Sequence, residues 1–131
     1  MTRTAAYAFF ADLVLVVIFA VIGRASHNEG ILGDAGLGLL ATVWPFAVPL
    51  VFAWLVPLAR RRPLAVLRTG VPIWLITVAA GMLLRALSGQ GTALAFIIVA
   101  TLTLLLFLVG WRVVAAAVLR SRAKRVDAAA R

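Results

Sequence analysis

The chain has 131 residues, of which 65% are hydrophobic, and its formal net charge is +9 at pH 7. This length suits one domain, and so apolar a composition leaves too little polar surface to cover a core in water. The sequence contains no cysteine, which excludes disulfides, thiolate metal sites and a cysteine nucleophile. The lipid bilayer is the partner that this composition predicts, and nucleic acid is not expected despite the positive charge.

Four long apolar stretches succeed one another, at residues 5–23, 36–59, 70–87 and 92–118. Each is close to or above the roughly 18–20 residues that a helix needs to cross the hydrocarbon core. Backbone groups in hydrocarbon must be paired within the segment, so the stretches are expected to be α-helices. The sequence therefore predicts an all-α integral membrane bundle of four transmembrane helices in up-down-up-down order. It forms one domain at residues 1–118, followed by a basic cytoplasmic tail at residues 119–131.

The basic residues are distributed unevenly between the two sides of this bundle. Only Arg24 and Arg85 fall on the side of the first and third loops. The others share the opposite side: Arg3, Arg60, Arg61, Arg62, Arg68, Arg112, Arg120, Arg122, Lys124, Arg125 and Arg131. Since basic residues concentrate in cytoplasmic segments, both termini are predicted to be cytoplasmic, with the tail near anionic lipid headgroups. The dominance of Arg over Lys, together with much Ala, indicates a GC-rich bacterial genome, so the expected location is a bacterial plasma membrane.

Proline and glycine predict where the helices bend and turn. Pro45, Pro49 and Pro57 lie in the second stretch, where each removes a backbone hydrogen bond and predicts a kink. Residues 88–91 read Ser-Gly-Gln-Gly, which predicts a tight turn. The third and fourth helices are therefore expected to be antiparallel neighbours.

The four tryptophans are predicted mainly as anchors at the membrane interfaces. Trp44 and Trp74 lie a few residues inside their stretches and are also candidates for lining a pocket. Trp54 is predicted to be such an interface anchor. Trp111 together with Arg112 is expected to mark the cytoplasmic interface, with the guanidinium reaching toward the headgroups.

Asp12 is the most informative polar residue because it lies near the middle of the first stretch. Its position also favours a retained helix over a cleaved signal peptide. A carboxylate there costs about 2.5–3.5 kcal/mol on insertion scales and usually faces a partner or a hydrated cavity. Thr77, Thr101 and Thr103 are expected at comparable depth and would complete a polar layer. The functional interpretation is a proton- or cation-binding site, and the structural one is a carboxyl that fixes helix packing through the threonines.

A second polar group is expected on the outer side. Arg85 lies in the outer half of the third stretch, and Glu29 or Asp34 is its predicted partner. Thr42 and Trp44 lie at similar depth, and the residues expected to gather into one outward-facing pocket are Arg24, Ser26, His27, Asn28, Glu29 and Arg85. The functional interpretation is a binding vestibule in which His27 titrates near neutral pH. The alternative is a capped helix end with a surface salt bridge.

Catalytic motifs are missing from the sequence. It has a single histidine, no HExxH motif, no nucleophile elbow and no glycine-rich phosphate loop after a strand. We therefore expect neither an enzyme nor a metal or cofactor site.

Several of these residues also carry a family resemblance. Asp12, the Gly23-Arg-x-Ser-His27 segment and Trp44-Pro45, followed by residues 70–74 and Arg85, resemble an uncharacterised prokaryotic membrane family, the domain of unknown function number thirty fifty-four. The resemblance extends to about Arg112. It implies a four-helix membrane fold and supplies no activity, substrate or site.

Two classes of function remain open on the sequence. The first is a small permease or channel for a small solute or ion, which would act as a homo-oligomer because four helices make a thin wall around a path. In this class Asp12 is similar in position to the lone acidic residue of small multidrug-resistance exporters. The second is a non-catalytic accessory or scaffold subunit of a membrane complex.

Overall fold

The computed structural model describes residues 2–26 and 36–130, and within them every regular element is helical. In chain order these are α1 (Arg3–Ser26), α2 (Leu37–Leu55), α3 (Pro57–Arg61), the π-helical turn η2 (Val66–Gly70), α4 (Val71–Leu87), α5 (Leu94–Leu108) and α6 (Gly110–Ala129). Four segments are long and apolar enough to cross a membrane: Arg3–Ser26, Leu37–Leu55, Val66–Leu87 and Leu94–Ala129. The predicted all-α bundle of four membrane helices is confirmed.

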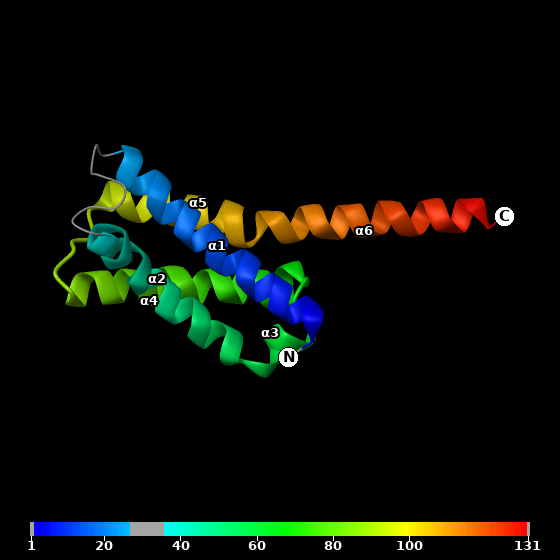
Figure 1. Ribbon diagram of the computed structural model, residues 1–131, viewed down its shortest axis with the longest axis horizontal. Helices are drawn as coiled ribbons and strands as arrows, with labels where there is room; N and C mark the ends of the chain where they lie inside the picture. The colour runs from blue at the N-terminus through cyan, green and yellow to red at the C-terminus, as the bar shows by residue number, and fades with distance from the viewer. Residues whose placement is uncertain (1, 27–35, 131) are drawn as a thin grey trace.

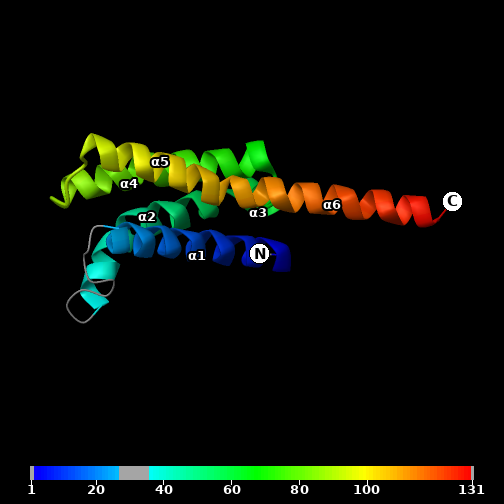
Figure 2. The ribbon, with the colours of Figure 1, turned by 90° about the horizontal axis from the view of Figure 1, so that it is seen from above.

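The four long helices form a ring in which α1 contacts α2 and α5, and α4 contacts the same two helices. Figure 1 shows their long axes running roughly together, and Figure 2 shows α4 and α5 on one side of the bundle with α1 on the other. A turn joins α4 to α5 with Gly89 and Gly91 at φ of 71° and 77°, a conformation that glycine adopts without steric cost. The predicted antiparallel pairing of these helices is confirmed.

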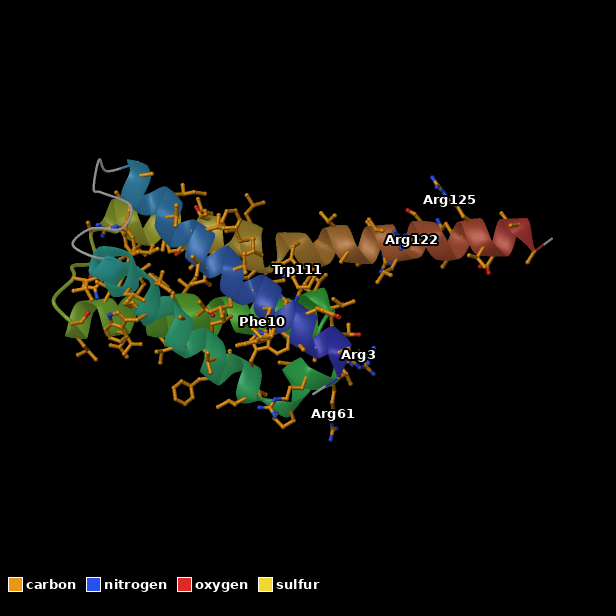
Figure 3. All side chains as sticks on the ribbon, in the orientation of Figure 1. Arg3, Phe10, Arg61, Trp111, Arg122 and Arg125 are labelled. Atoms are coloured by element: carbon orange, nitrogen blue, oxygen red, sulfur yellow. The ribbon has the colours of Figure 1, made fainter. Side chains whose placement is uncertain are left out.

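The bundle has two different ends. At the loop end, α1 and α4 finish and α2 and α5 begin. At the terminal end, α1 begins, α3 and η2 connect α2 to α4, and α6 leaves the bundle as a long straight helix (Figure 1). Figure 3 shows Arg3 and Arg61 at the terminal end, with Arg122 and Arg125 farther out along α6.

The second apolar stretch is not one helix up to residue 59, as the sequence predicted. Pro45 and Pro49 lie inside α2, but Val56 is extended, with φ −64° and ψ 126°, and Pro57 begins the separate helix α3. The proline ring disfavours helical geometry in the residue before it, so the chain breaks at Val56. This break lets α3 and η2 fold across the terminal end.

Many large apolar side chains face outward from the bundle. Phe10, Leu83 and Leu102 are 58%, 59% and 59% exposed, whereas α1, α2, α4 and α5 each bury a few mostly small or apolar side chains on their inner faces. Exposed apolar surface on this scale is costly in water and favourable against lipid chains. Together with the four spanning helices, it defines a multi-pass membrane protein.

Candidate functional site

The fully buried carboxylate of Asp12 lies at the centre of a hydrogen-bond cluster near the terminal end. Arg112 donates to both oxygens, from Nη1 to Oδ1 at 2.8 Å and from Nη2 to Oδ2 at 2.7 Å. The indole Nε1 of Trp54 donates to Oδ2 at 2.9 Å, and that of Trp111 donates to Oδ1 at 2.8 Å. Both charged side chains are 0% exposed. We call Asp12, Trp54, Trp111 and Arg112 the ion-pair cluster.

The backbone around the start of α6 makes room for Arg112. Its amide bonds to the carbonyl of Val109 at 3.1 Å instead of to that of Leu108, and its own guanidinium donates to the Leu108 carbonyl. Its Nε donates to the carbonyl of Pro63 at 3.0 Å. Gly70 provides the space, because a Cβ there would lie 2.9 Å from Cδ of Arg112. The side chain thus ties α6, η2 and the α3–η2 connection to α1.

This cluster differs from the arrangement that the sequence predicted. Arg112 was expected to reach toward headgroups and instead turns into the bundle, where a buried carboxylate offers a stronger partner than water or lipid. Trp54 was expected as an anchor at the membrane surface, but it is 3% exposed and bonded to Asp12. One signal was present in the sequence: Arg112 lies inside the long fourth stretch, whereas an interface residue would follow it.

The predicted threonine layer around Asp12 is wrong. Thr77 is fully buried, but its hydroxyl has no hydrogen-bond partner within residues 2–26 and 36–130. The backbone carbonyl of Thr101 accepts a bond from Trp74 at 3.0 Å. The indole donors and Arg112 occupy the carboxylate, because each offers a stronger or better-placed hydrogen bond than a threonine hydroxyl.

The geometry of the ion-pair cluster fits an anchor better than a proton or cation site. A carboxylate has about four lone-pair positions, and here four N–H donors bond to its two oxygens. The guanidinium already neutralises the carboxylate charge, so a second cation would gain little there. Breaking such a buried pair by removing one partner typically costs about 3–5 kcal/mol.

A pocket of about 490 Å³ opens at the loop end between all four long helices. We call it the loop-end pocket. Its lining residues are Phe19, Ala20, Gly23, Arg24, Ser26, Thr42, Arg85, Gln90, Gly91, Ala93, Ala95, Phe96 and Val99. A volume in this range holds a small molecule.

Two guanidinium groups are positioned at this pocket by neighbouring polar groups. Arg24 on α1 donates from Nη1 to the carbonyl of Gly38 at 3.1 Å and to the hydroxyl of Thr42 at 3.3 Å. Arg85 on α4 donates to the side chain and the carbonyl of Gln90 at 3.0 and 3.2 Å. Its guanidinium carbon also lies 4.2 Å from the ring centroid of Phe96. Both arginines are partly buried, which strengthens their electrostatic field relative to an open surface.

The structure brings together part of the pocket that the sequence predicted. Arg24, Ser26, Thr42 and Arg85 all line it. Trp44 is 39% exposed and is not among its lining residues. The predictions that involve His27, Asn28, Glu29 and Asp34, including an Arg85 pair with either carboxylate, lie outside the described residues. Asp12 and Thr77 lie apart from this pocket, nearer the core of the bundle.

Fold and site together define a small multi-pass membrane protein with a polar pocket at one end and a buried ion pair near the other. The chain belongs to the protein family of unknown function DUF3054, whose model matches residues 9–115. This span contains most of α1, the whole of α2, α4 and α5, the ion-pair cluster and the described lining of the pocket. No curated protein matches the chain. No solved structure matches it either.

Proposed function

We propose that this protein is a small carrier that passes a small solute across a bacterial plasma membrane, with both termini in the cytoplasm. The observation that supports this most is the difference between the two ends of the bundle. The loop end holds a cavity of about 490 Å³, whereas the ion-pair cluster closes the bundle toward the terminal end. A carrier needs this asymmetry, because a solute site that opens to one side must be shut on the other.

The floor of the loop-end pocket is an apolar barrier. Phe19 and Phe96 line the pocket and pack against Phe46, with ring centroids 5.3 and 6.3 Å from the Phe46 ring. Beyond them toward the terminal end, Val16 and Leu104 are 0% exposed. A polar solute would lose its hydration in this layer, which is costly without hydrogen-bonding partners. Passage through the bundle therefore requires the helices to move.

Three features supply places where the helices can rearrange. Pro45 and Pro49 interrupt the hydrogen-bond ladder of α2. At the junction of α5 and α6, the Leu108 carbonyl bonds to a side chain instead of to the next turn. Thr77 on α4 keeps a buried hydroxyl without a partner in the described part of the chain, so a rearrangement of this face would break no side-chain hydrogen bond of Thr77 there.

Single-cysteine labelling tests the carrier, because the chain contains no natural cysteine. Gly23→Cys reports on the loop-end pocket, where an added Cβ meets no atom within 4 Å. Ala8→Cys reports on the terminal end, where Ala8 is 2% exposed and lies one helical turn before Asp12. With a charged, membrane-impermeant maleimide, we expect rapid labelling of Gly23→Cys from the loop-end side. We also expect slower labelling of Ala8→Cys from the terminal side, whenever the bundle opens there.

Leu83→Cys is the control, because Leu83 is 59% exposed on the lipid-facing surface and a charged reagent does not reach it. If Ala8→Cys reacts no faster than Leu83→Cys from either side, the terminal end does not open and the carrier proposal fails. The accessory-subunit role would then take its place. One observation favours that second candidate: α6 has 20 residues and buries only Arg112, so most of the helix is exposed for a partner in a membrane complex.

A further inference from the structure

We propose that the terminal end of the bundle binds one anionic phospholipid, in a small cleft beside the break at Val56. The cleft has a volume of about 70 Å³ and is lined by residues of α2, α3, η2 and α4. We call it the terminal-end cleft. It lies apart from the loop-end pocket and shares no lining residue with it.

The apolar part of the terminal-end cleft faces the lipid. Val56, Leu58 and Ile76 line it and are 47%, 46% and 39% exposed. Its volume is far below the roughly 300–1,000 Å³ of a pocket that encloses a small molecule. The cleft therefore fits a segment of one acyl chain whose remainder stays in the bilayer, and it does not fit an enclosed soluble ligand.

A cation lies at the other end of the same cleft. Arg68, on η2, is exposed and is among the lining residues. Ile76 follows it by eight residues, which is about 12 Å along a helix. Arg68 is thus nearer the membrane surface and Ile76 nearer the membrane interior. A phospholipid has the same order, with its phosphate at the surface and its chains inside.

Further arginines surround this position. Three consecutive ones, at residues 60–62, end α3 and begin its connection to η2, and Figure 3 shows Arg61 at the terminal end. The hydroxyl of Thr69 donates to the carbonyl of Arg62 at 2.7 Å, so α3 and η2 are held side by side. Guanidinium groups bind phosphate through charge-assisted hydrogen bonds.

The described part of the chain offers these arginines no carboxylate. It contains two acids, of which Asp12 is buried in its ion pair with Arg112. Asp127 lies 17 residues beyond the start of α6, or about 25 Å along that helix. The counter-charge for Arg68 and its neighbours must therefore come from outside the described residues, and anionic headgroups supply it at a membrane surface.

Native mass spectrometry of the full-length protein, released from detergent with added lipid, tests the site. The probes are dioleoyl phosphatidylglycerol and dioleoyl phosphatidylcholine, which have the same chains and differ in net charge. We expect the first phosphatidylglycerol to bind about tenfold more tightly than the first phosphatidylcholine, since one charge-assisted hydrogen bond is worth about this factor.

Variants of the cleft separate the two parts of the site. Arg68→Gln should remove most of the tenfold preference and leave phosphatidylcholine unchanged, whereas Arg68→Lys keeps the charge and should retain part of the preference. Ile76→Trp fills the cleft and should weaken both lipids alike. The matched controls are Arg122→Gln, on the exposed part of α6, and Leu83→Trp, at a lipid-facing position of α4. Neither control should change the binding of either lipid.

Three results would overturn the lipid site. The first is equal binding of the two lipids. The second is an effect of Arg122→Gln as large as that of Arg68→Gln, which would mean that the basic surface attracts anions without a defined position. The third is an effect of Ile76→Trp no larger than that of Leu83→Trp.

The phosphatidylglycerol headgroup without chains, glycerophosphoglycerol, distinguishes a lipid from a free phosphate compound. At equal concentration it should leave the bound phosphatidylglycerol in place, and displacement would assign the site to a soluble phosphate instead. The site does not depend on carrier activity. Lipid binding and labelling of Ala8→Cys are separate measurements, so either can fail while the other succeeds.

Discussion

At the scale of single residues, the role of Asp12 shows that the bonded partner of an acid in a membrane helix decides whether the acid is a site or a structural contact. A lone intramembrane carboxylate predicts an ion or proton site. Paired with Arg112 and bonded to two indoles, the same carboxylate becomes the anchor that joins α1 to α6. An acid at position 12 of this chain therefore indicates a structural requirement as readily as a functional one.

This anchor gives a direct prediction for Asp12→Asn. The substitution keeps the shape of the side chain but leaves Arg112 charged and buried without its counter-ion, so we expect a loss of about 3–5 kcal/mol in the free energy of unfolding. Adding Arg112→Met should recover much of this loss, because the survivor of a broken pair is then removed too. Thermal unfolding in detergent, followed by circular dichroism, measures the cycle.

Asp127→Asn is the matched control for this cycle, since Asp127 is an exposed acid on α6 and its loss should be close to neutral. Strict additivity of Asp12→Asn and Arg112→Met would contradict the anchor, because residues that share a buried pair should be strongly coupled.

Side-chain partners were the part of the molecule that the sequence predicted least well. Depth estimates placed Asp12 among threonines because they count residues along straight helices. The actual partners are a guanidinium that turns back into the bundle and the Trp54 indole, which was expected at the membrane interface. The hydrogen-bond partners of a buried carboxylate depend on which donors can reach it in the folded bundle. The periodicity of the sequence carries no information on that reach.

At the scale of elements, α2 and α4 share the most extensive contact in the ring. Gly81 faces α2, and a Cβ there would lie 2.5 Å from Cδ1 of Phe46 and 3.2 Å from the carbonyl oxygen of Pro45. Pro49 donates no hydrogen bond to that carbonyl. Gly81 on α4 therefore packs closely against the proline-containing segment of α2. The sequence shows the prolines and the glycine, but it does not show that they are in contact.

Gly81→Ala tests this contact. The methyl group would force Phe46 or the α2 backbone to move, and overpacking of this kind typically costs about 1–3 kcal/mol. Gly23→Ala is the control, because it lies in α1 with nothing within 4 Å of the added Cβ and should gain helix propensity instead. Equal unfolding temperatures for the two variants would contradict the close packing of α2 on α4.

At the scale of the whole molecule, hydropathy was sufficient to predict four membrane helices, because a bilayer imposes length and backbone pairing on any segment that crosses it. The depth of Arg24, Thr42 and Arg85 in their apolar stretches also predicted that they lie near one another, since all three fall at the same end of neighbouring helices. Hydropathy did not predict the break at Val56 as a helix end, nor the closure of the terminal end by Arg112. Both depend on local geometry that only packing reveals.

The orientation in the membrane remains a prediction from the charge distribution. Basic residues gather at the terminal end and along α6 (Figure 3), so this end is expected in the cytoplasm. Ser88→Cys at the loop end and Ser121→Cys on α6 are both exposed positions. In intact cells, an impermeant maleimide should label the first and spare the second. Labelling of Ser88→Cys only from the cytoplasmic side would reverse the orientation and the direction in which the pocket opens.

The central claim is that the terminal end, closed by the ion-pair cluster, opens when the protein works. The most direct test is a distance measurement by pulsed electron resonance between spin labels at Arg3→Cys and Val113→Cys, both exposed positions on α1 and α6. In liposomes we expect two distances, and the further substitution Asp12→Asn should raise the population of the longer one. A single narrow distance that Asp12→Asn leaves unchanged would contradict this claim.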